Sequence, residues 1–403
     1  MMVSFLLFWS AVSVVGSSSV LTVAFFLALH GRSRGKTARI VGGPSVHLVR
    51  PLCGREDAAD RKNLSLLRQD YSPLTVAFVA ESELDLALTD ARRVCATEGR
   101  GACFTAKNAS AVSGKARNMI AGWHSSTSEI VGFCDSDIEL SADDVGRCVA
   151  AMSECRASAA FAPCLFDAEG CWGRLAMQVA TIDKFTLAEA GAVLGIVPCL
   201  EGGLMLVSRP ALEAAGGIEV VSRAIADDLR IGLVLRAQGH RLGVSTAPVL
   251  HRTRSESAAV WAQRYLRWSI CRRTEAPWVQ VATLALHPIL VPLVIAIGCS
   301  SGDALALLLI GILWRVAYAH AVSRFLLAPH GVHGGAEWCW ARPIAEILDG
   351  AFMAVAFLTR SMTWRGCVYK IDFRGQITRD DEQSTGELAS RRTARGRARF
   401  RLG

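Results

Sequence analysis

An uncharged apolar segment at the start of the chain most constrains how this protein can fold. Residues 3–29 contain no acidic or basic side chain, and as a helix they are long enough to cross a bilayer core of about 30 Å. A cleaved signal peptide would begin with basic residues and have a shorter apolar core. Since this segment begins without a basic residue, we expect a retained transmembrane anchor.

Basic residues directly after the anchor predict its orientation. Four of them follow with no acidic residue between them: Arg32, Arg34, Lys36 and Arg39. Loops on the cytoplasmic side of a membrane are rich in Lys and Arg. We therefore expect an integral membrane protein whose main domain lies on the cytoplasmic face.

A second apolar region, residues 279–360, contains three candidate membrane segments. The chain is 51% hydrophobic and 20% charged, which is more apolar than a typical soluble domain, and the excess lies at its two ends. Residues 279–298 are long enough to span. Residues 304–326 form a second candidate, whose Arg315 we expect to snorkel to the interface. The third segment, 343–358, is shorter.

The end of the chain limits the number of crossings. Residues 361–403 form a basic tail, with six arginines and no acid after Ser390, so we expect this tail in the cytoplasm as well. An anchor that enters the cytoplasm then requires an even number of later crossings. Because 343–358 carries Glu346 and Asp349, we expect it to be interfacial or re-entrant, which leaves three crossings and a multi-pass protein.

Short apolar runs alternate with helix-like stretches in the predicted domain, residues 45–276. Six runs rich in Val, Ile, Leu or Phe predict buried strands: 45–52, 73–81, 102–107, 129–135, 159–166 and 202–208. This alternation predicts an α/β domain with a mainly parallel sheet, in which ligands bind beyond the carboxyl ends of the strands. The 13 cysteines include no CxxC pair, so we interpret them as reduced and mostly buried rather than as a metal cluster.

The strongest local motif places two carboxylates at the end of the predicted strand 129–135. Asp135 and Asp137 stand at i and i+2 and can converge on one hard cation, Mg²⁺ or Mn²⁺. Such a cation would bridge the diphosphate of a nucleotide sugar and offset the charge on the leaving group. The alternative is a helix cap, since Asp and Ser are favoured before a helix.

Two further motifs carry acidic and basic side chains. Asp227 and Asp228 could supply a general base for an acceptor hydroxyl, or they could simply begin a solvated helix. Arg264 and Arg267 share a helical face that could grip a diphosphate, with Trp268 packing under a sugar ring or an acceptor. A basic amphipathic helix lying on anionic lipid also explains these residues.

In their order and spacing these motifs resemble the processive-type inverting glycosyltransferases, and most closely the ceramide glucosyltransferase family. The resemblance covers nearly the whole chain, since the anchor, the C-terminal membrane segments and a late box from Thr363 to Asp372 are similar too. It implies a nucleotide-sugar-binding domain of the GT-A-like fold. Its Lys-x-x-Asn segment matches Lys115 and Asn118, which implies that Lys115 lies on the donor side.

The resemblance also implies a role for each motif residue. Asp135 and Asp137 would bind the metal and the donor, Asp228 would be the base, and three residues would close around the diphosphate and the acceptor: Arg264, Arg267 and Trp268. One departure is that the family's first aspartate, which contacts the nucleotide base, falls on Glu81. Glutamate keeps the charge and could still accept a hydrogen bond from uracil; Glu83 and Asp85 are the alternatives.

The reaction implied is a single displacement that moves a sugar, in the first place glucose, from a UDP-sugar to the hydroxyl of a membrane lipid such as ceramide. A hopanoid lipid that receives N-acetylglucosamine fits the same residues, whereas a polysaccharide synthase would need more crossings after Trp268. A silent membrane scaffold or transporter component disagrees with the polar motifs. Nucleic acid is not an expected partner, because the basic clusters flank membrane segments and no nucleic-acid-binding module is present.

Overall fold

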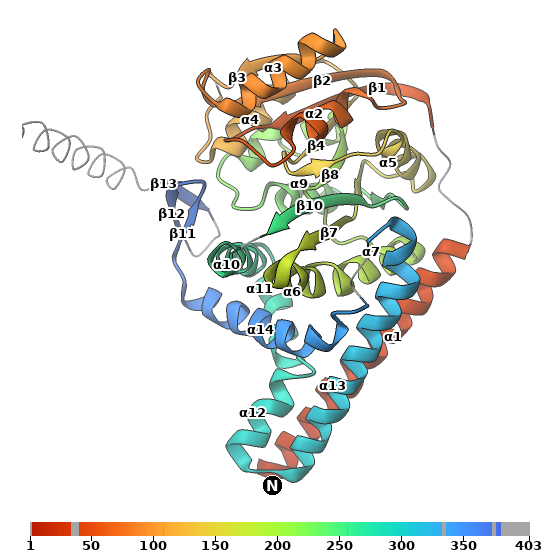
Figure 1. Ribbon diagram of the computed structural model, residues 1–403, viewed down its shortest axis with the longest axis vertical. Helices are drawn as coiled ribbons and strands as arrows, with labels where there is room; N and C mark the ends of the chain where they lie inside the picture. The colour runs from red at the N-terminus through yellow and green to blue at the C-terminus, as the bar shows by residue number, and fades with distance from the viewer. Residues whose placement is uncertain are drawn as a thin grey trace, which may run out of the picture.

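The computed structural model describes residues 2–33, 40–107, 109–255, 257–332, 336–372 and 376–379. Their helices and strands form an α/β domain, a group of long apolar helices beside it and a small C-terminal sheet (Figure 1). Three of the basic residues after the anchor lie outside the described residues, as does the arginine-rich end of the predicted tail: Arg34, Lys36, Arg39 and residues 380–403.

A seven-stranded sheet forms the centre of the α/β domain. In spatial order its strands are β3 (Ala102–Thr105), β2 (Ser72–Ala80), β1 (Gly42–Pro51), β4 (Ile130–Cys134), β8 (Leu204–Ser208), β6 (Ala159–Ala162) and β9 (Leu242–Val244). Neighbouring strands are parallel except for the two pairs that involve β8. The predicted α/β class with a mainly parallel sheet is therefore confirmed.

Helices cover both faces of this sheet, because alternate side chains of each strand point to opposite faces. Leu48 of β1 belongs to a hydrophobic cluster with α2 (Ala59–Leu67), α3 (Leu86–Glu98) and α5 (Asp144–Glu154). The next residue, Val49, belongs to a second cluster with α4 (Gly114–His124), α8 (Arg209–Ala214) and α9 (Asp227–Ala237). The carboxyl ends of the central strands are thus fixed from both sides.

The predicted strand 159–166 is wrong as a single element, because the chain divides at Pro163. Residues before it form β6 in the main sheet, and residues after it form β7 (Cys164–Glu169) in a separate sheet of order β5-β10-β7. The other members are β5 (Ile138–Glu139) and β10 (Val249–Ser255). Proline has no N–H to donate to a strand ladder, so it interrupts the pairing here. The second sheet reaches the loop that carries Asp137.

Two described helices are long and apolar enough to cross a membrane. They are Met2–Arg32 within α1 (Met2–Ser33), the predicted anchor, and Gly302–His330, which contains α13 (Gly302–Val322). The predicted segment 279–298 is not one straight helix, since α11 (Pro277–Ala285) and α12 (Leu290–Cys299) meet at an angle of 51°. Pro288 lies in the break, and His287 Nδ1 accepts hydrogen bonds from the N–H groups of Ile289 and Leu290.

Helix α14 (Arg342–Leu358) contains the segment predicted to be interfacial. Figure 1 shows it lying across the group of apolar helices, between them and the α/β domain. It packs against α10 (Ala258–Glu275), α6 (Gly170–Ala180) and α13. Its two carboxylates are buried rather than facing solvent: Asp349 pairs with Arg272, and Glu346 pairs with Arg315. The expectation that Arg315 snorkels is wrong, because the residue is 2% exposed and ion-paired inside the protein.

The first residues of the predicted tail fold into a three-stranded antiparallel sheet. Its strands are β11 (Ser361–Trp364), β12 (Cys367–Ile371) and β13 (Ile377–Arg379). Arg365 and Gly366 form the turn between the first two strands with φ values of 51° and 78°. Ile377 N–H donates to the Arg223 carbonyl at 3.1 Å, so this sheet is attached to the α/β domain.

Candidate functional site

The two aspartates of the Asp135-x-Asp137 motif lie at the carboxyl end of the central strand β4. Asp135 N–H donates to the Gly203 carbonyl at 3.2 Å, and Asp137 Oδ2 lies 2.9 Å from His251 Nε2 on β10. The motif leads into the short strand β5, and the next helix begins only at Asp144. The alternative interpretation as a helix cap is therefore wrong.

A buried arginine fixes the loop that carries these aspartates. Arg50, at the end of β1, is fully buried and donates to the Ile138 carbonyl at 2.7 Å and to Cys134 Sγ at 3.2 Å. These contacts clamp the loop just before and just after the motif. Burying a charge without a carboxylate partner is costly, so the fold uses this residue to hold a defined loop geometry.

Lys115 joins two of the predicted motifs into one cluster. Its Nζ lies 2.7 Å from Asp135 Oδ1 and 3.0 Å from Asp227 Oδ2. Burial alone would lower the pKa of Lys115, but Asp135 and Asp227 raise it above its ordinary value. Burial raises the pKa of Asp135 to about 6, against the opposing effect of Lys115. The cluster holds more carboxylates than this one lysine can neutralise.

Asp137 behaves differently from its neighbour. Burial alone would raise the pKa of this carboxyl, but His251 and the charge of Arg264 hold it well below its usual range. His251 itself is buried, with its ring 4.5 Å from that of Phe166. Asp137 therefore remains ionised and is held in one orientation, as a ligand for a cation would need to be.

A glycine separates Asp135 from Asp228. A Cβ atom on Gly202 would lie 3.3 Å from Asp135 Oδ2 and 3.3 Å from Asp228 Oδ2, so a side chain would crowd both carboxylates. Asp228 stands in the first turn of α9, and both burial and Asp227 raise its pKa. The Asp227-Asp228 pair thus begins a helix and lies beside Asp135, while its role as a general base stays a prediction.

A polar pocket lies in front of this cluster. We call it the polar pocket, and its lining consists of Pro51, Leu52, Cys53, Glu81, Gly114, Lys115, Asp135, Ser136, Asp137, Arg267, Trp364, Arg365, Cys367 and Tyr369. Five of the residues selected from the sequence meet there: Glu81, Lys115, Asp135, Asp137 and Arg267. Asp228, Arg264 and Trp268 are not among the lining residues.

Of the three candidate acids after β2, Glu81 is the one that reaches the polar pocket. It pairs with Arg117, and its carboxylate packs so closely on Gly114 that a Cβ there would lie 1.9 Å from Oε2. Glu83 instead pairs with Arg92, and Asp85 accepts hydrogen bonds from the N–H groups of Gly54 and Ala87. Among the three acids, only Glu81 lines the polar pocket, so it is the one that could face a bound base.

The Arg-x-x-Arg-Trp motif lies on α10, with its three side chains directed to different partners. Arg267 Cζ lies 5.1 Å from the Trp364 ring centroid, a cation–π contact that joins α10 to the C-terminal sheet. The charge of Arg264 acts on Asp137. Trp268 packs on Phe166 at 5.4 Å between ring centroids, and so supports the ring that supports His251.

The β11–β12 hairpin forms one wall of the polar pocket. We assigned no role to it from the sequence. Arg365 at its tip donates to the Cys53 carbonyl at 2.9 Å and pairs with Glu56 at 2.7 Å. A positive φ is costly for a side-chain-bearing residue other than Asn or Asp. Arg365 adopts this conformation, and its guanidinium lies beside the loop that follows β1.

The carboxylates at the polar pocket fit a divalent cation that is also coordinated by a bound diphosphate. Within the described residues no three histidine, cysteine or carboxylate side chains lie close enough to hold a metal ion unaided. Asp135 and Asp137 provide hard oxygen donors, and Mg²⁺ usually takes one or two carboxylates together with substrate phosphates. The residues therefore fit a cation shared with a diphosphate, although they do not form a self-sufficient metal site.

Three elements of the site were missed from the sequence. His251 and Glu201-Gly202 lie in stretches without a recognisable spacing, and only the fold brings them to the aspartates. The hairpin was visible as the Thr363–Asp372 box, but nothing in the sequence showed which surface it would cover. The cysteines are all free thiols, most of them half-buried rather than buried as expected.

Comparison with known sequences identifies the family. The sequence model of glycosyl transferase family 21 matches residues 8–377. The chain belongs to this family. Its similarity to ceramide glucosyltransferase 1 of Caenorhabditis elegans is 22% identity over 263 residues, which is 64% of this chain and 56% of that protein. Ceramide glucosyltransferase 3 of the same organism is 22% identical over 240 residues, 59% of this chain and 52% of that protein.

The family 21 chain thus spans about half the length of the curated relatives it matches. Among solved structures, it is similar to a mannosyltransferase from Pyrobaculum calidifontis in complex with GDP-Man and Mn²⁺, with 15% identity, a TM-score of 0.49 and coverage of 86% of this chain and 99% of that one. Glucosyl-3-phosphoglycerate synthase from Mycobacterium tuberculosis in complex with Mn²⁺ and UDP-glucose is 13% identical, with a TM-score of 0.38 and coverage of 58% of this chain and 80% of that one.

Proposed function

We propose that this family 21 protein is an inverting glycosyltransferase that moves glucose from UDP-glucose to the hydroxyl of a membrane lipid, ceramide in the first place. The family membership and the names of its curated relatives support the reaction class and the acceptor. The long apolar helices beside the α/β domain support an acceptor that resides in the bilayer. The polar pocket is the proposed donor site.

One observation carries this proposal: Asp135 and Asp228 both lie against Gly202, each with an oxygen 3.3 Å from the position of a Cβ atom there. Asp135 lines the polar pocket, whereas Asp228 lies outside its lining. Two carboxylates so placed can serve the two partners of a transfer, with one at the donor phosphates and the other at the acceptor hydroxyl. A single displacement needs one such group for each partner, because acceptor and leaving group occupy opposite sides of the anomeric carbon.

Each residue has a defined part in the mechanism. Asp228 takes the proton from the acceptor hydroxyl as the oxygen attacks the anomeric carbon, and its raised pKa brings its basicity closer to that required at neutral pH. Arg267 and Lys115 face the diphosphate that departs, and Glu81 faces the base. A divalent cation held by Asp135 and Asp137 would offset the charge that builds on the leaving diphosphate.

The same proposal gives the protein an orientation in the membrane. The α/β domain would lie on the cytoplasmic face, where UDP-sugars are made, with the anchor, the bent pair α11–α12 and α13 as three crossings. Helix α14 would lie in the interface, in keeping with its position across the apolar helices in Figure 1. To test this arrangement, cysteines would be placed after residue 33 and at Ser300 in a background without the exposed Cys171. Their accessibility to an impermeant thiol reagent would then be measured.

The decisive experiment is sugar transfer by the purified protein. The protein in detergent would be incubated with UDP-[¹⁴C]glucose, Mn²⁺ and ceramide, and the lipid product analysed by mass spectrometry. The expected product is a hexosyl-ceramide with inverted anomeric configuration. Hydrolysis of UDP-glucose without a lipid product would contradict ceramide as the acceptor. If cells that lack the protein also lack a hexosaminyl-hopanoid, the acceptor is a hopanoid rather than ceramide.

A further inference from the structure

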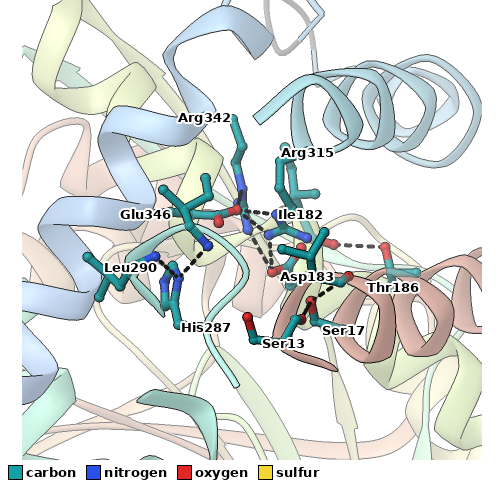
Figure 2. A network of polar contacts seen from close by, with 12 residues as sticks. Ser13, Ser17, Ile182, Asp183, Thr186, His287, Leu290, Arg315, Arg342 and Glu346 are labelled. Atoms are coloured by element: carbon teal, nitrogen blue, oxygen red, sulfur yellow. Dashed lines mark hydrogen bonds and ion pairs between the residues drawn. The ribbon is translucent and has the colours of Figure 1, made fainter. Parts of the chain in front are cut away.

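Two neighbouring residues at the start of α7 (Ile182–Leu194) connect the membrane helices with the carboxylates of the site. Asp183 forms ion pairs with Arg315 on α13 and with Arg342 on α14 (Figure 2). Both arginines also pair with Glu346. The next residue, Lys184, pairs instead with a carboxylate near the site: its Nζ lies 3.2 Å from Glu201 Oε2.

Glu201 brings Lys184 close to the proposed base. The Glu201 side chain is 7% exposed and is fixed by a hydrogen bond from Cys164 N–H at 3.2 Å. It directly precedes Gly202, the glycine between Asp135 and Asp228. The Lys184 charge is near enough to act on Asp228, whose pKa it draws downward against the effects of burial and Asp227. Lys184 therefore belongs to the surroundings of Asp228.

Lys184 lies outside the polar pocket, which is the proposed donor site. Neither Lys184 nor Glu201 nor Asp228 is among the residues that line the polar pocket. The Lys184 side chain is 52% exposed, in contrast to the buried carboxylate it pairs with. An ammonium group has three N–H donors and no acceptor. Within the described part of the chain, Glu201 is the only side chain that pairs with it, so donors remain for a ligand.

Resting on the proposed function, we propose that Lys184 is the acceptor-binding residue of this enzyme, donating hydrogen bonds to a second oxygen beside the lipid hydroxyl that Asp228 deprotonates. The chemistry selects a lipid with an oxygen acceptor, such as an amide carbonyl or a second hydroxyl, next to the reacting group. Glu201 and Asp183 act as positioning residues. Asp183 ties the first turn of α7 to α13 and α14, so the helices that contact the bilayer set the position of the ammonium group.

The test compares two acceptors that differ in this second oxygen. Short-chain ceramide carries an amide carbonyl and a second hydroxyl beside its primary hydroxyl, whereas a primary alcohol of matched chain length has the reacting hydroxyl alone. The full-length protein in detergent would be assayed with UDP-glucose and each acceptor, as wild type, Lys184→Met and Lys184→Arg. Methionine keeps the length of the side chain and removes the charge, while arginine keeps the charge and the donors.

We expect Lys184→Met to raise the KM for ceramide by about tenfold, because a hydrogen bond from a charged donor is lost. The KM for UDP-glucose should stay unchanged, and the kcat/KM should fall less for the simple alcohol than for ceramide, because loss of the Lys184 charge acts on Asp228 with either acceptor. Lys184→Arg should restore most of the ceramide activity. Glu201→Gln should shift the KM for ceramide in the same direction by a smaller factor. A merely structural lysine would instead affect both acceptors equally.

Two results would overturn the inference while leaving the proposed function intact: an unchanged KM for ceramide in Lys184→Met, or an equal loss with both acceptors. If that variant fails to fold, as judged by its thermal unfolding midpoint, Lys184→Gln is measured in its place and the same criteria apply. If the wild-type protein hydrolyses UDP-glucose but transfers nothing to ceramide, the proposed acceptor is wrong and the inference falls with it.

Discussion

Two clusters of charged residues lie close together in this molecule, and they are built on opposite principles. At the junction with the long apolar helices, two arginines and two carboxylates pair with each other: Arg315, Arg342, Asp183 and Glu346. Beside the polar pocket, by contrast, Asp135, Asp227 and Asp228 lie near Lys115, and the charge of Lys184 acts on Asp228 as well. The first cluster has equal numbers of basic and acidic side chains, whereas the second has more carboxylates than lysines.

This difference separates a structural cluster from a binding cluster. Buried charges are tolerated in a fold when each has an opposite partner, and a balanced cluster needs no ligand. Burial, together with the neighbouring carboxylates, raises the pKa values of Asp135 and Asp228, and a surplus of carboxylates attracts cations. We expect substitutions in the balanced cluster to affect stability first, and substitutions in the surplus cluster to affect transfer first.

The largest effect should come from Asp228→Asn. Loss of the base should lower the rate of transfer by about 10²–10⁴-fold and leave donor affinity unchanged, because asparagine keeps the shape without accepting the proton. In the wild type, transfer should decline as the pH falls through the raised pKa of Asp228, at a higher pH than for an ordinary aspartate. Initial rates of lipid glycosylation across pH would measure both; a fully active variant would exclude Asp228 as the base.

Arg315→Met should have the next largest effect, on stability rather than on chemistry. Removing one partner leaves Glu346 and Asp183 buried with an unbalanced charge, which costs about 3–5 kcal/mol. The control is Arg252→Met, since Arg252 is 43% exposed and its pair with Asp167 should contribute less than about 1 kcal/mol. Denaturant unfolding in detergent measures both, and equal losses would show that the balanced cluster is not structural.

Asp137→Ala should weaken donor binding only when metal is present. We expect the Kd for UDP-glucose to rise by about tenfold or more with Mn²⁺ and to change little in EDTA, because the carboxylate would act through a cation. Titration calorimetry under both conditions provides the measurement. Asp167→Ala, on the neighbouring strand β7, is the matched control; a loss of affinity that is the same with and without Mn²⁺ would argue against a metal ligand.

A smaller effect is expected for Arg365→Asn at the tip of the β11–β12 hairpin. Asparagine tolerates the positive φ of the turn, so the substitution removes the guanidinium while preserving the backbone. The KM for the donor should rise by about three- to tenfold as the contacts to Cys53 and Glu56 are lost. Arg360→Asn, at an exposed position before the hairpin, should have no effect on that KM, and equal behaviour of the two variants would contradict the assignment.

Local signals in the sequence were sufficient for the elements that depend on them. The apolar run of α1, the strands β1 and β2 and the Asp135-x-Asp137 loop were all predicted, because periodicity and burial are encoded in neighbouring residues. Four of the residues selected by motif reach one pocket for the same reason: Glu81, Asp135 and Asp137 follow strands, and Lys115 begins a helix. The fifth, Arg267, comes from the middle of α10.

The sequence could not show which distant residues complete these elements. His251 lies 114 positions from Asp137, and Arg315 lies 132 positions from Asp183, so no local spacing connects them. A charge within an apolar helix predicts snorkelling unless the partner is known, and here the partners come from α7 and α14. The split at Pro163 was overlooked because the apolar run continues across it, although proline cannot pair within a strand.

The hairpin that closes the polar pocket has a consequence for how the protein is made. Translation delivers the α/β domain first, then the segments from α11 to α14, and only afterwards the residues Trp364 to Tyr369. A nascent chain therefore has the aspartates in place while one wall of the pocket is still missing. Because that wall is synthesised after the long apolar helices, chain order alone delays a complete pocket until those helices have left the ribosome.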